Sequence, residues 1–341
     1  MSNPPIQVNV MRGGIIESAH QIKAIVVDSS GETVSSWGDM EPLVYPRSAI
    51  KALQALAFME RGGAQKYGFN EQEIAILCAS HNGEKQHTET VQKMLAKLWL
   101  TPKDFECGHH WPMRAEAGYE LASAGLTPNN LHNNCSGKHA GMLGLAKLLQ
   151  ADHKHYIDIE HAVQKTIAAT MAEMCEIDFT NLPHSPDGCS APTWAIPLYN
   201  LALGFAKFAD PAMLTAERKT ACNTLFGAVV SNPFMVAGTG RYCTEMMQAL
   251  GQRVFLKVGA EGVYIAAIPD LKLAVALKCE DGAARGAESV MTAILERIGA
   301  TDHISEDAVA KFKRVRLTNW NKLETGEIIS TLSPNAERKL I

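Results

Sequence analysis

The chain has 341 residues, of which 46% are apolar and 20% charged, and its net charge is -4. This length allows a sizeable hydrophobic core, and the balanced charge gives no electrostatic reason to bind nucleic acid or an anionic membrane. The first residues lack the cationic start and apolar run of a signal peptide, and no uncharged apolar run reaches the roughly 18 residues of a membrane span. The sequence therefore predicts a soluble cytoplasmic protein.

The N-terminal part of the chain is rich in strand patterns. Ile6–Met11 and Ile22–Asp28 are apolar runs typical of strands, and Thr33–Trp37 follows a Ser-Ser-Gly turn as the expected return strand of a hairpin. Apolar residues at helical spacing predict a helix over Arg47–Arg61. The short apolar run Ile74–Cys78 predicts a buried strand that feeds a turn.

Helical patterns dominate the middle of the chain, and strand patterns return near its end. The predicted helices cover Glu84–Leu98, Gly137–Gln150, Ile159–Glu176, Ala191–Phe208, Pro211–Val229, Thr239–Leu250 and, last, Gly286–Ile298. The later predicted strands are Val254–Val258, Val263–Ile268 and Leu271–Leu277. Strands at both ends with helices between them predict an α+β fold, in which helices flank one mostly antiparallel sheet. We expect a single domain over residues 1–341 with a largely helical middle section at about 84–250.

The eight cysteines do not form a disulfide pattern. They are widely spaced, and a reducing compartment keeps thiols free, so most are expected to be buried as small apolar residues. Cys135 and Cys189 are the exceptions, because each stands next to other residues that can ligate a metal.

A serine and a lysine stand three residues apart in Ser48-Ala49-Ile50-Lys51. On a helix such residues share a face, so the amine can lie over the hydroxyl. A serine becomes a good nucleophile only when a base removes its proton, and a lysine amine does so in its neutral form, which burial or nearby positive charge favours. Such tetrads also arise by chance in many helices, so this motif alone is a weak signal.

Two further motifs strengthen the first. Ser80-His81-Asn82 and Lys257-Val258-Gly259 each end a predicted strand. The order S-x-x-K, S-x-N, K-x-G is the motif set of serine β-lactamases and penicillin-binding proteins. A second hydroxyl–amine pair, Ser80 with Lys257, could pass a proton to a departing amine, and the glycine would let a substrate lie against the strand. The alternative is that all three are ordinary solvated surface residues.

A fourth group of residues has the chemistry of a metal site. Cys135-Ser136-Gly137-Lys138-His139 is matched at a distance by Asp187-Gly188-Cys189. Zn²⁺ prefers sulfur and nitrogen donors in tetrahedral geometry, although a lysine ligand is unusual and the spacing is a poor zinc signal. Alternatively, Cys135 precedes a helix N-terminus that lowers the pKa of its thiol.

These motifs together resemble the Rhizobium-type L-asparaginases, also called the asparaginase II family, over nearly the whole chain. The matching segments are Arg12-Gly13-Gly14 with Glu17 and His20, Pro46–Lys51, Ala79–Glu84, Asn133–His139, Asp187–Pro192 and Lys257–Gly262. The resemblance implies a fold like that of glutaminases and serine β-lactamases, a homodimer, and hydrolysis of L-asparagine to L-aspartate and ammonia. It also implies two Ser-Lys pairs, Ser48 with Lys51 and Ser80 with Lys257, and a supportive zinc ion held by Cys135, Lys138 and Cys189.

Our interpretation is an amidohydrolase that works through a serine acyl-enzyme. Arg47 and Asp187 are the candidates for binding the charged α-carboxylate and α-ammonium of the substrate, and His139 is a further candidate for substrate contact. One rival is a β-lactamase or penicillin-binding-type acyltransferase, against which the missing export signal counts. The other is a non-enzymatic zinc or thiol sensor, which would leave the three ordered motifs unexplained.

Overall fold

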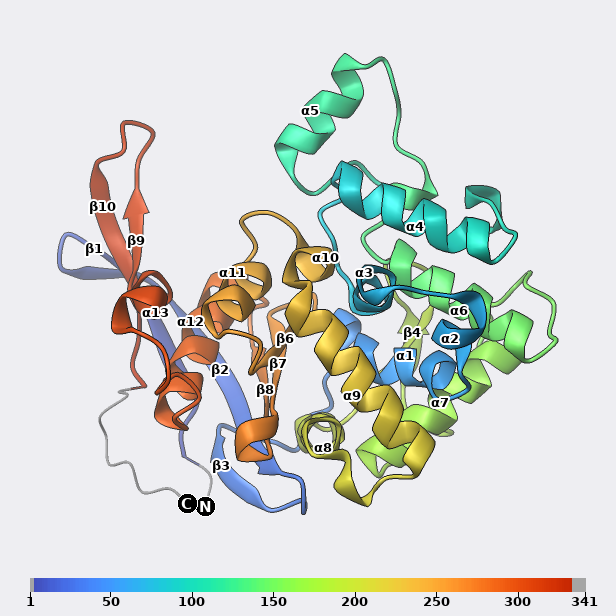
Figure 1. The fold of residues 1–341 in the computed structure, drawn as a ribbon. Coiled ribbons are helices and arrows are strands. Elements are labelled where there is room, and N and C mark those ends of the chain that lie inside the picture. The colour runs from blue at the N-terminus through green and yellow to red at the C-terminus, as the bar shows by residue number, and fades with distance from the viewer. Residues whose placement is uncertain (1–2, 333–341) are drawn as a thin grey trace. The chain divides into compact units, whose positions relative to one another are not determined.

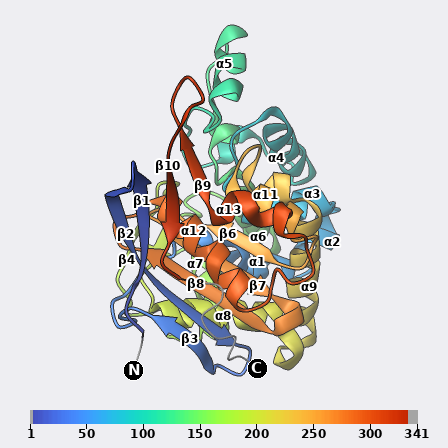
Figure 2. The same cartoon turned by 90° about the vertical axis from the view of Figure 1, so that its left-hand side faces the viewer.

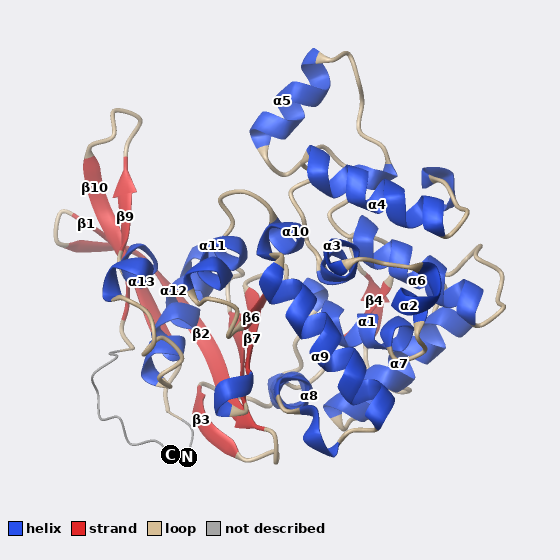
Figure 3. Cartoon of the chain, viewed as in Figure 1, coloured by secondary structure: helices blue, strands red, loops and turns tan. Residues whose placement is uncertain are grey.

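The structure, a computed structural model, describes residues 3–332, which divide into two compact units. Unit 1 comprises residues 3–49, 196–210 and 249–332 and contains the large sheet (Figure 1). Unit 2 comprises residues 50–195 and 211–248 and is mostly helical (Figure 3).

Unit 1 is built on one eight-stranded antiparallel sheet, with strand order β6-β7-β8-β2-β1-β10-β9 and β3 paired to β2 (Figure 2). The strands are β1 (Ile6–Arg12), β2 (Ile15–Asp28), β3 (Thr33–Trp37), β6 (Phe255–Val258), β7 (Val263–Ile268), β8 (Leu273–Cys279), β9 (Val315–Thr318) and β10 (Glu324–Ser330). Strands from both ends of the chain therefore share one sheet, which confirms the predicted α+β class.

The centre of this sheet is buried because β8 lies between β7 and β2. Ile22 pairs with Cys279 and Val26 with Val275, which fixes the register of β2 against β8. Consecutive residues at the start of β8 are all buried, so both faces of the strand are covered. The helices that pack on β8 and β2 are α8 (Leu198–Ala209) and α12 (Ala284–Arg297), and α13 (Glu306–Lys313) packs on α12.

Unit 2 consists of helices and one small sheet. Its helices are α1 (Lys51–Met59), α2 (Gly63–Tyr67), α3 (Glu71–Ala75), α4 (Lys85–Lys97), α5 (Ala115–Ser123), α6 (Ser136–Leu148), α7 (Ala162–Cys175), α9 (Ala216–Ser231), α10 (Pro233–Ala237) and most of α11 (Tyr242–Ala249). Strands β4 (His184–Pro186) and β5 (Pro192–Trp194) pair antiparallel. Within residues 3–332, no helix is long and apolar enough to cross a bilayer.

Residues 3–332 also contain six short 3-10 helices. They are η1 (Arg47–Ile50), η2 (Ile76–Cys78), η3 (Pro102–Asp104), η4 (Asn130–His132), η5 (Pro211–Met213) and η6 (Pro269–Leu271). Two of them bear on the site, because η1 contains Ser48 and directly precedes α1, and η2 ends two residues before Ser80.

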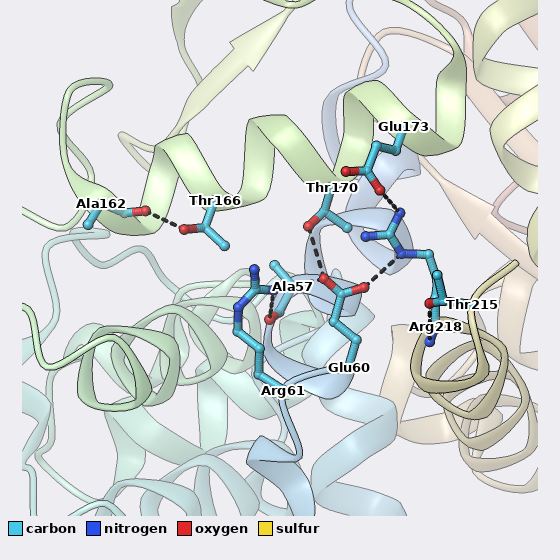
Figure 4. A network of polar contacts seen from close by, with 9 residues as sticks. All are labelled: Ala57, Glu60, Arg61, Ala162, Thr166, Thr170, Glu173, Thr215 and Arg218. Carbon is cyan, nitrogen blue, oxygen red and sulfur yellow. Dashed lines mark hydrogen bonds and ion pairs between the residues drawn. The ribbon is translucent and has the colours of Figure 1, made fainter.

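An ion-pair network ties three helices of unit 2 together (Figure 4). Glu60, at the end of α1, accepts a hydrogen bond of 2.7 Å from Arg218 Nε on α9. Arg218 also pairs with Glu173 on α7, and Thr170 of α7 donates to Glu60 at 3.4 Å. The side chains of Arg218 and Glu60 are only 12% and 11% exposed, so the pair is shielded from water. The network therefore anchors α1, the helix that begins with Lys51.

Two predicted elements were wrong. Ile74–Cys78 is not a strand, because Asn70 and Glu73 form a capping box that starts α3, and the apolar run continues as η2. The helix predicted over Ala191–Phe208 begins only at Leu198, since Pro192–Trp194 pairs as a strand. The predictions also omitted α2, α5, α10, α13, β4, β9 and β10.

The expectation for the cysteines is confirmed. All eight are free thiols and all eight are buried.

Candidate active site

The amine of Lys51 is the centre of the site in unit 2. Lys51 is the first residue of α1 and is 1% exposed. Its Nζ donates to Ala79 O, lies 3.1 Å from Ser80 Oγ and lies 3.0 Å from Cys135 Sγ. The amine of the first motif thus contacts the serine of the second motif and the first cysteine of the predicted metal site.

Residues 79–84 form a non-helical loop that presents Ser80 to Lys51. Backbone hydrogen bonds fix this loop: Ser80 N donates to Val236 O at 2.8 Å, and His81 N donates to Asn134 O at 3.2 Å. The N–H groups of these two neighbouring residues therefore donate to two different segments of the chain, and neither forms a helical hydrogen bond. The sequence predicted that Ser80 follows a strand, whereas it follows the 3-10 helix η2.

The three predicted zinc ligands lie together in unit 2. Lys138 Nζ is 3.1 Å from Cys189 Sγ, and the thiol of Cys135 is hydrogen-bonded to Cys189. All three side chains are buried. Cys135 Sγ also accepts a hydrogen bond from the Lys51 amine. The same amine contacts the Ser80 hydroxyl, so Lys51 connects the two cysteines and Lys138 to Ser80.

The electrostatics of this cluster make Cys189 the thiolate. The hydrogen bond from Cys135 lowers the pKa of Cys189 well below its ordinary value, and the ammonium of Lys138 acts in the same direction. The same hydrogen bond, together with burial, raises the pKa of Cys135 to about 12. Burial opposes ionisation of Lys138, but Cys189 and Cys135 outweigh it and raise the pKa of the ammonium. The expectation of a lowered pKa at Cys135 was therefore wrong, because the charge lies on its partner.

Local packing brings the cluster together. Cys135 immediately precedes α6, and a Cβ at Gly137 would lie 2.2 Å from Ile76 O, so only glycine lets α6 lie this close to η2. On the other side, the turn Asp187–Ala191 is closed by Asp187 N donating to Ala191 O at 2.8 Å. Ser190 in this turn has a φ of 69°, a conformation that costs energy for a residue other than glycine.

Two buried histidines flank the site and are neutral. Burial lowers the pKa of His81 and of His139 well below the ordinary range. His81 is satisfied, since its Nδ1 accepts from Gly83 N and its Nε2 donates to Ser136 Oγ at 2.9 Å. His139 Nδ1 lies 2.8 Å from Tyr156 Oη, but within residues 3–332 its buried Nε2 has no partner. His139 therefore keeps one ring nitrogen available for a ligand.

In unit 1, the third motif lies against the first. Lys257 is fully buried in β6, and its Nζ donates to Val258 O at 2.6 Å. A Cβ at Gly259 would lie 2.5 Å from Pro46 O and 3.1 Å from Ala49 N. The glycine was expected to make room for a substrate, and the neighbour it accommodates here is the segment of the chain that carries Ser48.

The two predicted contacts for the charged ends of a substrate are half-buried. Arg47 has a φ of 50°, so the residue before Ser48 is backbone-strained. Asp187 Oδ1 accepts a hydrogen bond of 2.8 Å from Gly188 N. Their roles in substrate binding stay predictions.

Sequence reasoning missed a network around Glu84. Its carboxylate accepts hydrogen bonds from Thr239 N and Thr239 Oγ1, both at 2.8 Å, and from Arg114 at 2.7 Å. Burial opposes ionisation of Glu84, but these donors together lower its pKa. Nothing in the spacing of Gly238-Thr239-Gly240 indicates that this turn binds the loop carrying Ser80.

A second cluster in unit 1 has metal-ligand chemistry but is internally satisfied. His20, Cys279 and Asp281 bring their donor atoms within 4.8 Å of one another. Cys279 and His20 both hydrogen-bond to Asp281 and lower its pKa. Arg285 Nε donates to His20 Nε2 at 3.0 Å, which places the imidazole proton on Nδ1, facing Asp281. This proton occupies the nitrogen that a metal would need.

The comparison with protein families decides the assignment. A family model described as L-asparaginase II matches residues 8–330. The chain belongs to the L-asparaginase II family. This membership confirms the resemblance that the motifs indicated, and it supports an asparaginase-type amidohydrolase with a small amino-acid substrate.

Solved structures resemble this L-asparaginase II family protein only distantly. A β-lactamase from Mycobacterium bovis is 14% identical with a TM-score of 0.39, and the match covers 86% of this chain and 95% of that one. A protein called Mglu is 13% identical with a TM-score of 0.43, covering 78% and 61%. An octameric penicillin-binding protein homologue from Pyrococcus abyssi is 12% identical with a TM-score of 0.33, covering 88% and 79%. A search of curated proteins gives no match.

The residues of this family member fit the zinc ion that the resemblance implies. Two sulfurs and one amine converge, and sulfur and nitrogen are the donors that zinc prefers. The adjacent His139 adds a buried ring nitrogen without a partner within residues 3–332. A lysine must lose its proton to ligate a metal, so binding here would release protons. Zinc itself stays a prediction.

Proposed function

We propose that the protein is an L-asparaginase that hydrolyses the side-chain amide of L-asparagine through a serine acyl-enzyme. Family membership supports the amidohydrolase class. The observation that carries the mechanism is the buried Lys51 amine, 3.1 Å from Ser80 Oγ and three residues from Ser48 along the chain. A buried amine beside a hydroxyl is the arrangement that Ser-Lys catalysis requires.

In the proposed reaction, Ser48 Oγ forms a bond to the amide carbon while Lys51 takes the hydroxyl proton. The carbon–nitrogen bond then breaks, and the second pair, Ser80 and Lys257, supplies the proton that lets the nitrogen leave as ammonia. Water attacks the resulting ester and gives a proton to the Ser80–Lys257 pair, Lys51 returns its proton to Ser48 Oγ, and L-aspartate and the free serine are released. Because Lys51 contacts Ser80, acylation of Ser80 is the alternative that the experiment below must separate.

The remaining predicted residues bind and orient the substrate in this proposal. Arg47 and Asp187 hold its α-carboxylate and α-ammonium. His139 offers its Nε2, which has no hydrogen-bond partner in the described part of the chain. A zinc ion on Cys135, Lys138 and Cys189 would supply a fixed positive charge beside the polar end of the substrate. The predicted homodimer and cytoplasmic location belong to the same proposal.

The rival functions make different demands on the residues. A β-lactamase or penicillin-binding-type acyltransferase would also need Ser48 and Lys51 but would open a lactam ring. A zinc or thiol sensor would need Cys135 and Cys189 but not Ser48.

The test is ammonia release from L-asparagine and L-glutamine, run beside nitrocefin hydrolysis. We expect release from L-asparagine, and a loss of about 10⁶-fold in kcat for Ser48→Ala, since nucleophile removal costs this much in well-studied serine hydrolases. Ser123→Ala, at an exposed position of α5, is the matched control. If Ser48→Ala keeps a tenth of the wild-type kcat while Ser80→Ala is inactive, Ser80 is the nucleophile. Turnover of nitrocefin alone would favour the lactamase.

A further inference from the structure

Arg241 is a half-buried arginine that has no acidic partner among residues 3–332. It follows the Gly238-Thr239-Gly240 turn and directly precedes α11. Its Nη1 donates to Asn82 Oδ1 at 2.9 Å. Within residues 3–332, no hydrogen bond or ion pair joins its side chain to a carboxylate. By contrast, Arg114 and Arg218 of the same unit each pair with two glutamates.

Arg241 is held close to the loop of residues 79–84, which carries Ser80. Segment 236–241 runs along residues 80–84: Ser80 N donates to Val236 O at 2.8 Å, and Asn82 Nδ2 donates to Thr239 O at 3.1 Å. Glu84 binds the same turn through the N–H and hydroxyl of Thr239.

The Asn82 side chain orients the guanidinium toward this loop. Asn82 follows Ser80 by two residues in this loop. Its amide nitrogen donates to Thr239 O of the turn, and its amide oxygen accepts from Arg241, so one side chain holds both the turn and the guanidinium beside the loop that carries Ser80.

The chemistry of this arrangement fits a carboxylate ligand. A guanidinium has five donors in a planar fork, and Asn82 engages only one terminal nitrogen. Because that partner is a neutral amide, the positive charge is not neutralised by the contact, and a carboxylate is the group that an arginine fork binds most strongly. Asn82 restricts the side chain in advance, which reduces the entropy lost when a ligand binds.

We propose that Arg241 is a second arginine, in addition to Arg47, that binds the α-carboxylate of the amino-acid substrate, and that it thereby makes the enzyme specific for substrates that carry one. This inference rests on the proposed hydrolysis of L-asparagine and adds a specificity residue to it. Asn82, the third residue of the S-x-N motif, is then a positioning residue that acts through Arg241.

Activity on three amide substrates distinguishes carboxylate binding by Arg241 from a purely structural role of this residue. L-Asparagine carries both charged groups, succinamic acid lacks the amino group, and 3-aminopropanamide lacks the carboxylate. In Arg241→Gln, kcat/KM should fall about 10–100-fold for the first two, mainly through KM, and stay unchanged for 3-aminopropanamide. Arg241→Lys, which keeps the charge but not the fork, should lie between. Arg253→Gln, which removes an exposed arginine paired with Asp270 at 3.4 Å, is the matched control. An equal loss on all three amides would mean that Arg241 only supports the loop, and no loss on any would exclude the contact; either result overturns the proposal.

A binding measurement keeps the proposal independent of turnover. Calorimetric titration with L-aspartate should show a Kd about 10–100-fold weaker in Arg241→Gln than in wild type. Titration with β-alanine, which lacks the α-carboxylate, should show no difference. If wild type releases no ammonia but shows this pattern, the proposed activity is wrong and the carboxylate site stands. If wild type does not bind L-aspartate, or if both proteins bind it equally, the site is refuted.

Discussion

Replacing Gly259 by alanine tests how closely the first and third motifs depend on each other. The added Cβ would lie 2.5 Å from Pro46 O and 3.1 Å from Ala49 N. A carbon–oxygen contact is normally about 3.3 Å or more, so the Pro46 carbonyl must move by about 0.8 Å. Such overpacking costs about 1–3 kcal/mol, and a misplacement of about 1 Å at a reacting group costs about 100-fold in rate. Because Ser48 lies between the two contacted residues, we expect kcat/KM for L-asparagine to fall about 100-fold while the protein still folds.

The matched control is Gly227→Ala in α9, where an added Cβ meets no atom within 4 Å and the backbone is helical. This change should keep full activity and stabilise the helix by about 0.5–1 kcal/mol. Thermal unfolding and ammonia release are measured on both variants. Full activity in Gly259→Ala would refute the reasoning, since Ser48 would then tolerate movement of its own segment.

Three further outcomes follow from the site and its surroundings. Lys51→Arg should be inactive in ammonia release, because a guanidinium does not lose its proton in the working range; a near-normal kcat would show that Lys51 serves only as a fixed charge. Removing zinc, or making Cys189→Ala, should raise KM more than it lowers kcat, with elemental analysis confirming metal loss; an unchanged KM, or an equal collapse of kcat, contradicts a supportive metal. Burial lowers the pKa of His87, so the folded protein keeps it neutral while the unfolded chain protonates near pH 6.5. Stability should therefore fall as pH drops below about 6.5, by up to about 1.4 kcal/mol per pH unit for this residue, and urea unfolding of His87→Gln should lose that part of the slope.

The sequence predicted the fold class because strand patterns stand at both ends of the chain. Thr33–Trp37 and Val263–Ile268 match β3 and β7 residue for residue. Ile74–Cys78 failed because five apolar residues carry no periodicity, and the capping box at Asn70 decides the conformation from outside the run. Glu324–Ser330 was omitted since its residues are mostly half-exposed and lack a clear alternation.

The candidate site was predicted as a set of motifs, not as a set of contacts. Local spacing relates Cys135 to Lys138, but the approach of Cys189 depends on how α6 packs, and Gly137 sets that packing through Ile76 O. The contact of Lys51 with Cys135 has the same tertiary origin. The sequence could not identify Arg241 as a site residue, because a single arginine after a glycine-rich turn is common in surface loops.

The position of β2 in the sheet has a consequence for synthesis of the chain. β2 pairs on one side with β8, and Ile22 meets Cys279, so the two strands leave the ribosome far apart in time. Residues 50–195 emerge in between and form most of unit 2 before the sheet can close. Until then β2 has an unpaired edge with apolar residues such as Ala24 and Val26, and an open edge of this kind pairs readily with other chains. A nascent chain that stops before residue 255 can pair β2 only with β1 and β3, so the edge that β8 covers stays open to other chains.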